Sequence, residues 1–149
     1  MAALLSPDLR DLLALHLVPG LGPRLTTALL ERFGSAAAAL RASALQLQEV
    51  PHIGAKIAQG LRAAMERIDV DAELALMEQS GVQLLVRGRD GFPKALENIP
   101  CPPHLLYIRG TLQASDSNSV ALVGSRSCTS MAARSQSAWR ATWPAPVTW

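Results

Sequence analysis

One short segment combines the residue types that suit the binding of an anion. In Val-Ala-Leu-Val-Gly-Ser-Arg-Ser, residues 120–127, an apolar run ends at Gly124. The run predicts a buried strand, and the glycine allows a close backbone turn after it. The N–H groups of Ser125, Arg126 and Ser127 could then face an anion, and the Arg126 guanidinium suits a phosphate or a base. The alternative is that Arg126 only braces the loop.

A second candidate is a pattern that occurs twice, Val-Pro-x-h-Gly-x-x-h, where h is apolar. The first copy contains Gly20 and Gly22, whereas the second has His52 in place of the first glycine and keeps Gly54. Each copy runs into a predicted helix, as in a helix-hairpin-helix motif. A small residue follows at the same spacing in both copies, Thr26 in the first and Ala58 in the second.

The chemistry expected of these hairpins is also phosphate binding. Glycine permits the tight turn, and the helix that follows has unpaired N–H groups and a positive dipole end. Arg24 and Lys56 lie just after the two turns and could add charge. The five residues Gly20, Gly22, Arg24, Gly54 and Lys56 are therefore candidates for a secondary DNA contact. The alternative is a compact module whose hairpins only pack, or one that contacts duplex DNA or a protein partner.

Catalysis, metal binding and cofactor binding have little support in the sequence. His16, His52 and His104 are scattered and have no metal-ligand spacing to Cys101 or Cys128. The segment after Val123 lacks the G-x-G-x-x-G spacing, and no acidic residue follows about 20 positions later, which argues against a dinucleotide enzyme. These observations argue against a dinucleotide-dependent enzyme and against a metal site, so we expect no metal and no other cofactor.

Composition indicates a globular protein of 149 residues, with 49% hydrophobic and 17% charged residues. The net charge of +2 argues against a strong non-specific nucleic-acid binder, because such affinity comes from neutralised phosphates. Two distant cysteines favour a reducing compartment, so we expect a cytoplasmic protein. The first 18 residues lack a basic segment and include acidic residues, which indicates neither a signal peptide nor a membrane span.

The elements that must position these groups change in type along the chain. Residues 1–68 read as a helical domain, with a serine before three of the expected helices: Ser6, Ser35 and Ser43. For residues 54–68 we expect a buried face made of Ile57, Leu61, Ala64, Met65 and Ile68.

From residue 69 the pattern becomes mixed. Residues 70–81 predict a helix closed by Gly81, residues 82–88 and 105–110 predict strands, and 119–124 a third strand. A short helical turn is expected at 94–99. This order is typical of the opening of an α/β domain with a largely parallel sheet. Asp69, Asp71 and Glu73 fit a solvated helix start, and Tyr107 fits half-buried core.

Residues 91–130 resemble the DNA-processing protein A family (DprA, also called Smf). The family's pattern is an aromatic-Pro pair, a Leu, a Pro-Pro pair, Leu-Tyr, a Gly, and a strand ending in Val-Gly-Ser-Arg. The matching residues here are Phe92, Pro93, Leu96, Pro102, Pro103, Leu106, Tyr107, Gly110, Val123, Gly124, Ser125 and Arg126. Phe92 departs from the usual Tyr, and Cys101 stands where an Asp is common. With the helical region, the resemblance covers roughly residues 8–130.

The resemblance implies a fold and a role. The fold is an α + α/β chain, in which an N-terminal helical domain of the helix-hairpin-helix or SAM-like type is followed by the first part of an incomplete Rossmann-like domain. The role is to bind and protect single-stranded DNA and to load the recombinase RecA onto it in natural transformation, with homodimers in intact members. The resemblance implies no catalytic reaction, so we expect a protein that is not an enzyme. It favours Gly124, Ser125 and Arg126 as DNA contacts, and Ser127 joins them because its N–H could face the same anion.

The tail after Ser130 departs from the family, which continues with Tyr-Gly and an amphipathic helix. If one nucleotide is restored after the Ser130 codon, the codons of Met131 and Ala132 read Tyr-Gly, and those of Trp139 and Trp143 encode apolar residues at helical spacing. We therefore predict three segments: a helical domain at 1–68, the start of a Rossmann-like domain at 69–130, and a frameshifted tail at 131–149. We expect this tail to be disordered or loosely packed, and it leaves the chain truncated.

Overall fold

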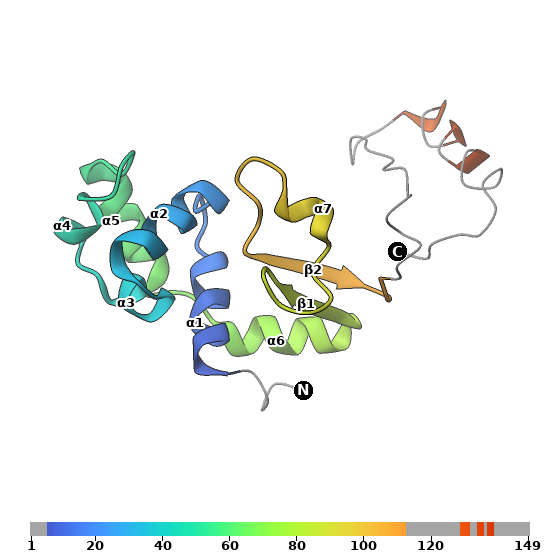
Figure 1. Ribbon diagram of the computed structural model, residues 1–149, viewed down its shortest axis with the longest axis horizontal. Coiled ribbons are helices and arrows are strands. Elements are labelled where there is room, and N and C mark those ends of the chain that lie inside the picture. Colours follow the sequence, from blue (N-terminus) through green and yellow to red (C-terminus); the bar gives the residue numbers. More distant parts are fainter. Residues whose placement is uncertain (1–5, 113–128, 132–133, 136, 139–149) are drawn as a thin grey trace. The chain divides into compact units, whose positions relative to one another are not determined.

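The computed structural model describes residues 6–112, 129–131, 134–135 and 137–138 (Figure 1). The chain divides into two compact units, residues 1–109 and 110–149. The described part of the first unit contains seven helices and two strands. In chain order they are α1 (Pro7–His16), α2 (Pro23–Phe33), α3 (Ala36–Arg41), α4 (Ala44–Leu47), α5 (Ala55–Met65), α6 (Val70–Gln79), β1 (Val82–Val86), α7 (Lys94–Glu97) and β2 (Leu105–Arg109).

The helices begin close to the predicted positions, but α5, α6 and α7 end two or three residues before the predicted ends at 68, 81 and 99. The Ser35 hydroxyl accepts a hydrogen bond from the Ala38 N–H at 3.1 Å, and Ser43 forms a reciprocal capping box with Gln46. Ser6 precedes α1, but its side chain makes no capping hydrogen bond. Asp69 caps α6 by accepting from the Ala72 N–H at 2.9 Å, so the acidic start of this helix is confirmed.

Helices α2 to α5 enclose the first of two apolar cores, to which α1 also contributes. We call it the hairpin core because residues of both predicted hairpins fill it. Its buried members are Leu15, Val18, Leu21, Leu29, Ala36, Ala39, Ala42, Leu47, Val50, Ile53, Ala58, Leu61 and Met65.

The predicted buried face of α5 is largely confirmed, with one error. Ile57 is 47% exposed, whereas Ala58, Leu61 and Met65 are buried. The buried residues of α5 follow one another at three- and four-residue spacing from Ala58, and Ile57 lies outside this row and faces solvent.

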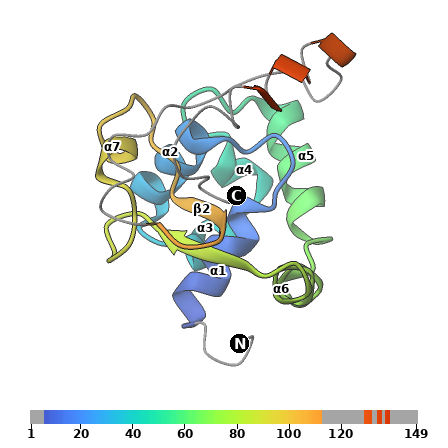
Figure 2. The same ribbon diagram turned by 90° about the vertical axis from the view of Figure 1, so that its right-hand side faces the viewer.

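The second core joins helices to the sheet. Leu9 and Leu13 of α1 pack with Leu74 and Met77 of α6 and with Leu105 of β2. Leu12 packs against both cores, so α1 is shared between them. Figures 1 and 2 both show α6 lying next to β1, in agreement with the contacts between these elements.

The two described strands are antiparallel, and here the prediction of a largely parallel sheet is wrong. Val82 pairs with Arg109, Leu84 with Tyr107 and Val86 with Leu105. A parallel pair needs a crossover of a dozen or more residues that packs on the sheet. The connection between β1 and β2 is long enough for a crossover, but its only described helix is the four-residue α7, and the chain returns beside β1 as a long hairpin. The third predicted strand lies outside the described residues, and the Rossmann-like fold stays a prediction.

Candidate nucleic-acid interface

The two hairpin turns have nearly the same backbone conformation. Gly20 has φ +81° and its counterpart His52 has φ +70°, so both lie in the left-handed region. Gly22 and Gly54, the caps of α2 and α5, have φ −82° with ψ 174° and 172°. The repeat that the sequence predicts is therefore present in the structure, although a histidine replaces one glycine.

Hydrogen bonds repeat between the turns as well. The Leu21 N–H donates to the Val18 carbonyl at 3.1 Å, and the Ile53 N–H donates to the Val50 carbonyl at the same distance. The first helical bonds, Thr26 N–H to Gly22 and Ala58 N–H to Gly54, measure 3.0 and 2.9 Å. Thr26 and Ala58 are both buried, which explains why small residues stand at this point in each copy.

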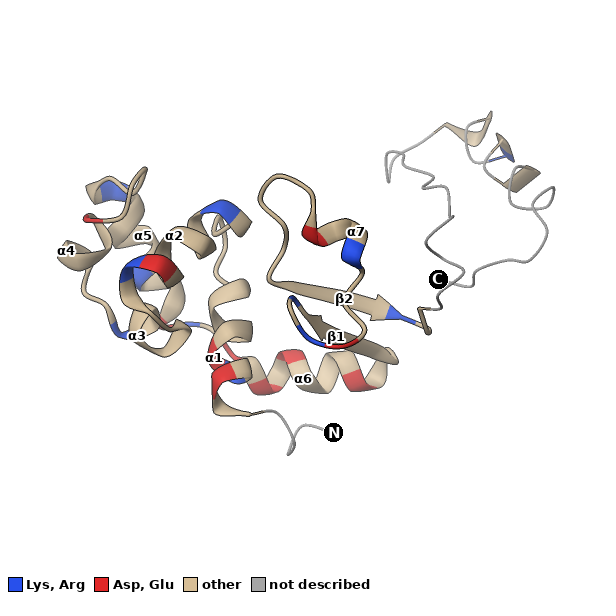
Figure 3. Ribbon diagram, viewed as in Figure 1, with Lys and Arg blue, Asp and Glu red and all other residues tan. Residues whose placement is uncertain are grey.

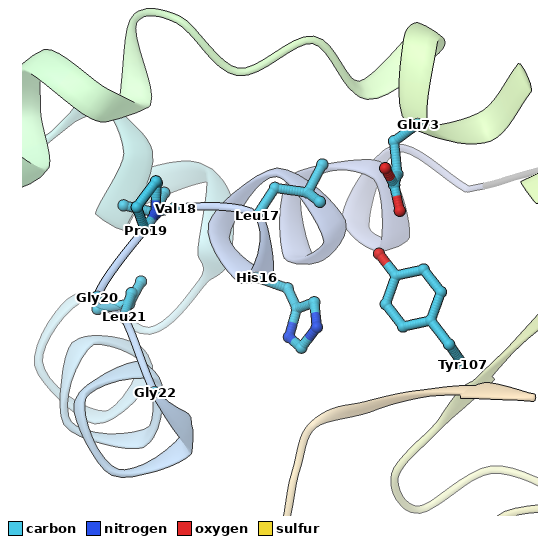
Figure 4. A pocket seen from close by; sticks show the side chains of 9 residues that line it. All are labelled: His16, Leu17, Val18, Pro19, Gly20, Leu21, Gly22, Glu73 and Tyr107. Carbon is cyan, nitrogen blue, oxygen red and sulfur yellow. The ribbon is translucent and has the colours of Figure 1, made fainter. Parts of the chain in front are cut away.

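The surroundings of the first turn do not favour a phosphate. The turn from Val18 to Gly22 lines an open depression together with Glu73 of α6 and Tyr107 of β2, and Figure 4 shows the Tyr107 hydroxyl pointing toward the Glu73 carboxylate. Figure 3 shows acidic residues along α6. In addition, Pro23 at the first position of α2 has no N–H to offer.

Burial controls the titration of the groups in this depression. It raises the pKa of Tyr107, and the Glu73 carboxylate raises it further, so the phenol stays protonated. His16, whose ring centre lies 5.6 Å from that of Tyr107, has its pKa lowered by burial, while Glu73 acts in the opposite direction. These side chains form a mostly neutral contact between α1 and β2, and nothing in it acts as a cation for DNA.

The second turn is better suited to an anion. Helix α5 begins with Ala55 and Lys56, which retain their N–H groups, and Lys56 forms no ion pair among the described residues. Arg24, which the sequence places after the first turn, reaches the second one: its Nη2 lies 3.0 Å from Nε2 of His52. Since arginine has only donors, His52 accepts this bond through a neutral ring nitrogen.

A third group of polar residues near the turns was missed by the sequence reasoning. The Thr27 hydroxyl donates to the Pro23 carbonyl at 2.9 Å, so Nε2–H of His104 must donate to Thr27 at 2.9 Å. The Arg87 N–H in turn donates to the His104 carbonyl at 3.0 Å. Burial lowers the pKa of His104, and the charges of Arg87 and His16 lower it further. The loop before β2 is thus fastened to α2 by a neutral histidine.

The strongest sequence candidates, Gly124, Ser125, Arg126 and Ser127, lie outside the described residues. Of the secondary candidates, the structure brings Arg24 to the second hairpin, next to the turn that contains Gly54 and precedes Lys56. Gly20 and Gly22 form the first turn, beside Glu73. No sequence signal marked Arg87 or Thr27, because their contacts join residues that are far apart in the chain.

Two family models match the chain. Residues 9–67 match the SAM-like helix-hairpin-helix tandem, and residues 83–142 match the family described as DNA recombination-mediator protein A. The second match is consistent with a protein of this family. The recombination-mediator match contains Val123, Gly124, Ser125 and Arg126 and continues past Ser130, the point at which we predict a change of reading frame; the frameshift and the truncation stay predictions.

Together the two matches support a protein that takes part in DNA binding, DNA processing and recombination. A search of curated proteins and a search of solved structures found no match to the chain. The described helices include none long and apolar enough to cross a membrane. Within the described ranges, no group of three or more His, Cys, Asp or Glu residues could hold a metal ion.

Several residues of the recombination-mediator pattern have structural roles in the described part. Phe92 is only 6% exposed, and Tyr107 packs against the second core. Cys101 has φ +56°, a conformation that Asp and Asn adopt more readily than most residues, which gives a physical reason for the Asp common at this point of the pattern. In the described part of the chain, Phe92, Cys101 and Tyr107 therefore help to shape the fold.

Proposed function

We propose that this protein is a recombination mediator that binds single-stranded DNA, protects it and loads the recombinase RecA onto it in natural transformation. The observation that carries the proposal is the family match over residues 83–142, which includes the Val-Gly-Ser-Arg segment at 123–126. In this role the protein uses binding energy alone and catalyses no reaction. It acts in the cytoplasm and as a homodimer.

The proposed DNA contacts are of two kinds. The backbone N–H groups after Gly124 hold a phosphate, and Arg126 binds a second phosphate or stacks on a base. The second hairpin adds a weaker contact through the start of α5 and Lys56. We assign a smaller contribution to DNA binding to the first hairpin, because Glu73 lies beside its turn and Pro23 lacks an N–H.

A second candidate function rests on the equivalence of the two turns. A tandem of hairpins with matching backbone angles suits a module that binds duplex DNA or a protein partner. The two candidates differ in the strand state that they prefer. A mediator prefers single strands, whereas a backbone-reading hairpin tandem binds duplex at least as well.

An electrophoretic shift with a single-stranded oligonucleotide tests the first candidate. We expect Arg126→Ala to weaken binding by roughly tenfold or more, the usual effect of losing a charged hydrogen bond to a phosphate. Arg109→Ala is the control: Arg109 is exposed at the end of β2, and its substitution removes the same charge. Equal binding by wild type and Arg126→Ala would contradict the assignment of Arg126. RecA loading is measured separately, as faster RecA assembly on single strands covered by a binding protein.

A further inference from the structure

A cavity of about 420 Å³ lies between the second hairpin, helix α2 and the loop that follows β1. Its polar lining comes from Arg24 and Thr27 of α2, His52 of the second turn, and Arg87 after β1. Pro102 and Ala28 give it apolar walls. Its volume lies within the roughly 300–1,000 Å³ typical of small-molecule sites.

The charges that line this cavity favour an anion at one end. Arg24 and Arg87 form no ion pair among the described residues, and the partner of Arg24 is the neutral His52 ring. Glu31 is the acidic lining residue, but it stands seven residues after Arg24 on α2, which corresponds to about 10 Å along the helix. An anion bound by Arg24 and His52 is therefore well separated from this carboxylate.

Backbone strain is concentrated in the same place. His52 and Cys101 are the two non-glycine residues with positive φ in the described part of the chain, and both line this cavity. In the first hairpin a glycine takes the position of His52, so the fold does not require a side chain there. Strained residues persist where the surroundings impose them, and they gather at ligand sites.

From these observations we infer that the cavity binds a nucleotide unit: a phosphate held by Arg24, His52 and Arg87, with its nucleoside against Pro102 and Ala28. The inference rests on the proposed function, because a DNA strand is the natural source of such a unit. Arg24 has five N–H donors and uses one of them in the hydrogen bond to His52, so the others remain for a phosphate. Arg87 adds a second guanidinium. Free nucleotides share this chemistry, so the test includes them.

Cys101 provides a direct reporter, since its thiol is free and exposed and the residue lines the cavity. The rate of Cys101 alkylation by iodoacetamide is followed by peptide mass mapping, which separates it from Cys128. The additions are a deoxythymidine oligonucleotide, deoxythymidine monophosphate, or inorganic phosphate. We expect the oligonucleotide to slow alkylation several-fold. Protection by the monophosphate alone also supports the site and assigns its source to free nucleotides.

Matched variants separate this site from general charge effects. Arg87→Gln and Arg89→Gln remove the same charge from exposed residues two positions apart, and only Arg87 lines the cavity. We expect Arg24→Gln and Arg87→Gln to abolish the protection of Cys101 and to weaken oligonucleotide binding by roughly tenfold. For Arg89→Gln we expect less than about a threefold change, since screened charges act weakly at a distance.

The experiments give different results if the cavity site is wrong and if the proposed function is wrong. If the chain binds single strands through Arg126, but Cys101 is not protected and Arg87→Gln behaves like Arg89→Gln, the cavity site is wrong and the proposed function stands. If nothing shifts single-stranded DNA, yet the monophosphate protects Cys101 in an Arg87-dependent way, the proposed function is wrong and the site stands. Lack of protection by all three additions overturns the inference.

Discussion

Gly20 and His52 occupy equivalent places in the two hairpins and share a positive φ, although only one of them is a glycine. The sequence pattern predicts this equivalence, because a tight turn at a fixed distance before a helix needs a left-handed residue. It does not predict that the His52 ring receives Arg24, since that contact depends on how α2 and the second turn pack.

Two glycine substitutions test the turn geometry. A Cβ at Gly20 would meet no atom within 4 Å, so the cost of Gly20→Ala comes from the backbone alone. At φ +81° we expect a loss of about 1–2 kcal/mol in the free energy of unfolding. Gly60 is the control, because it lies inside α5 with equally open space, and Gly60→Ala should stabilise by about 1 kcal/mol. Urea unfolding measures both, and a stabilised Gly20→Ala protein would contradict the left-handed assignment.

The lowered pKa values of two histidines should make the stability of the fold depend on pH. Burial lowers the pKa of His16 and of His104 in the folded protein below the unfolded value of about 6.5. The unfolded chain therefore takes up protons first as the pH falls below about 6.5, and the free energy of unfolding decreases. We expect His16→Gln/His104→Gln to flatten this decrease between about pH 7.5 and 5.5. Urea unfolding at both pH values checks it, and an unchanged slope in the variant would mean that these rings are not buried as neutral groups.

At the scale of elements, local chemistry predicts the helices well and the sheet less well. Ser35 and Ser43 cap α3 and α4 as expected, because a cap depends on residues within one turn. The exposure of Ile57 on α5 was not predicted, because which residues of a helix are covered depends on the other helices that pack against it. The antiparallel pairing of β1 and β2 depends on the path of the loop between them, which has no periodic signal.

Equivalent leucines test whether the two hairpins share one core. Leu29 of α2 is 0% exposed and Leu61 of α5 is 4% exposed. We expect Leu29→Ala and Leu61→Ala each to lower the free energy of unfolding by about 2–5 kcal/mol, because each leaves a cavity in the same core. Leu45→Ala is the control, since Leu45 is 77% exposed and should change stability by less than about 0.5 kcal/mol. Calorimetry checks all three, and a small effect at only one of the buried leucines would show that the hairpins do not unfold together.

At the scale of the whole first unit, α1 links the two cores, and His104 links the loop before β2 to α2. The sequence assigns these segments to separate domains, because their helical and mixed patterns differ. It gives no signal for Thr27 with His104, which are 77 residues apart, since such a contact depends on the packing of the complete fold. The division at residue 68 stays a prediction, and the cavity near Arg87 exists because segments from both sides of that division meet there.

The central claim is that the protein binds single-stranded DNA through its backbone phosphates. The most direct measurement is fluorescence anisotropy of the full chain with labelled single-stranded and duplex oligonucleotides of equal length over a range of salt concentrations. We predict tighter binding to single strands, with an affinity that falls by about 0.7 log units per phosphate contact for each tenfold rise in salt. Equal affinity for both forms, or binding that salt leaves unchanged, would contradict this account.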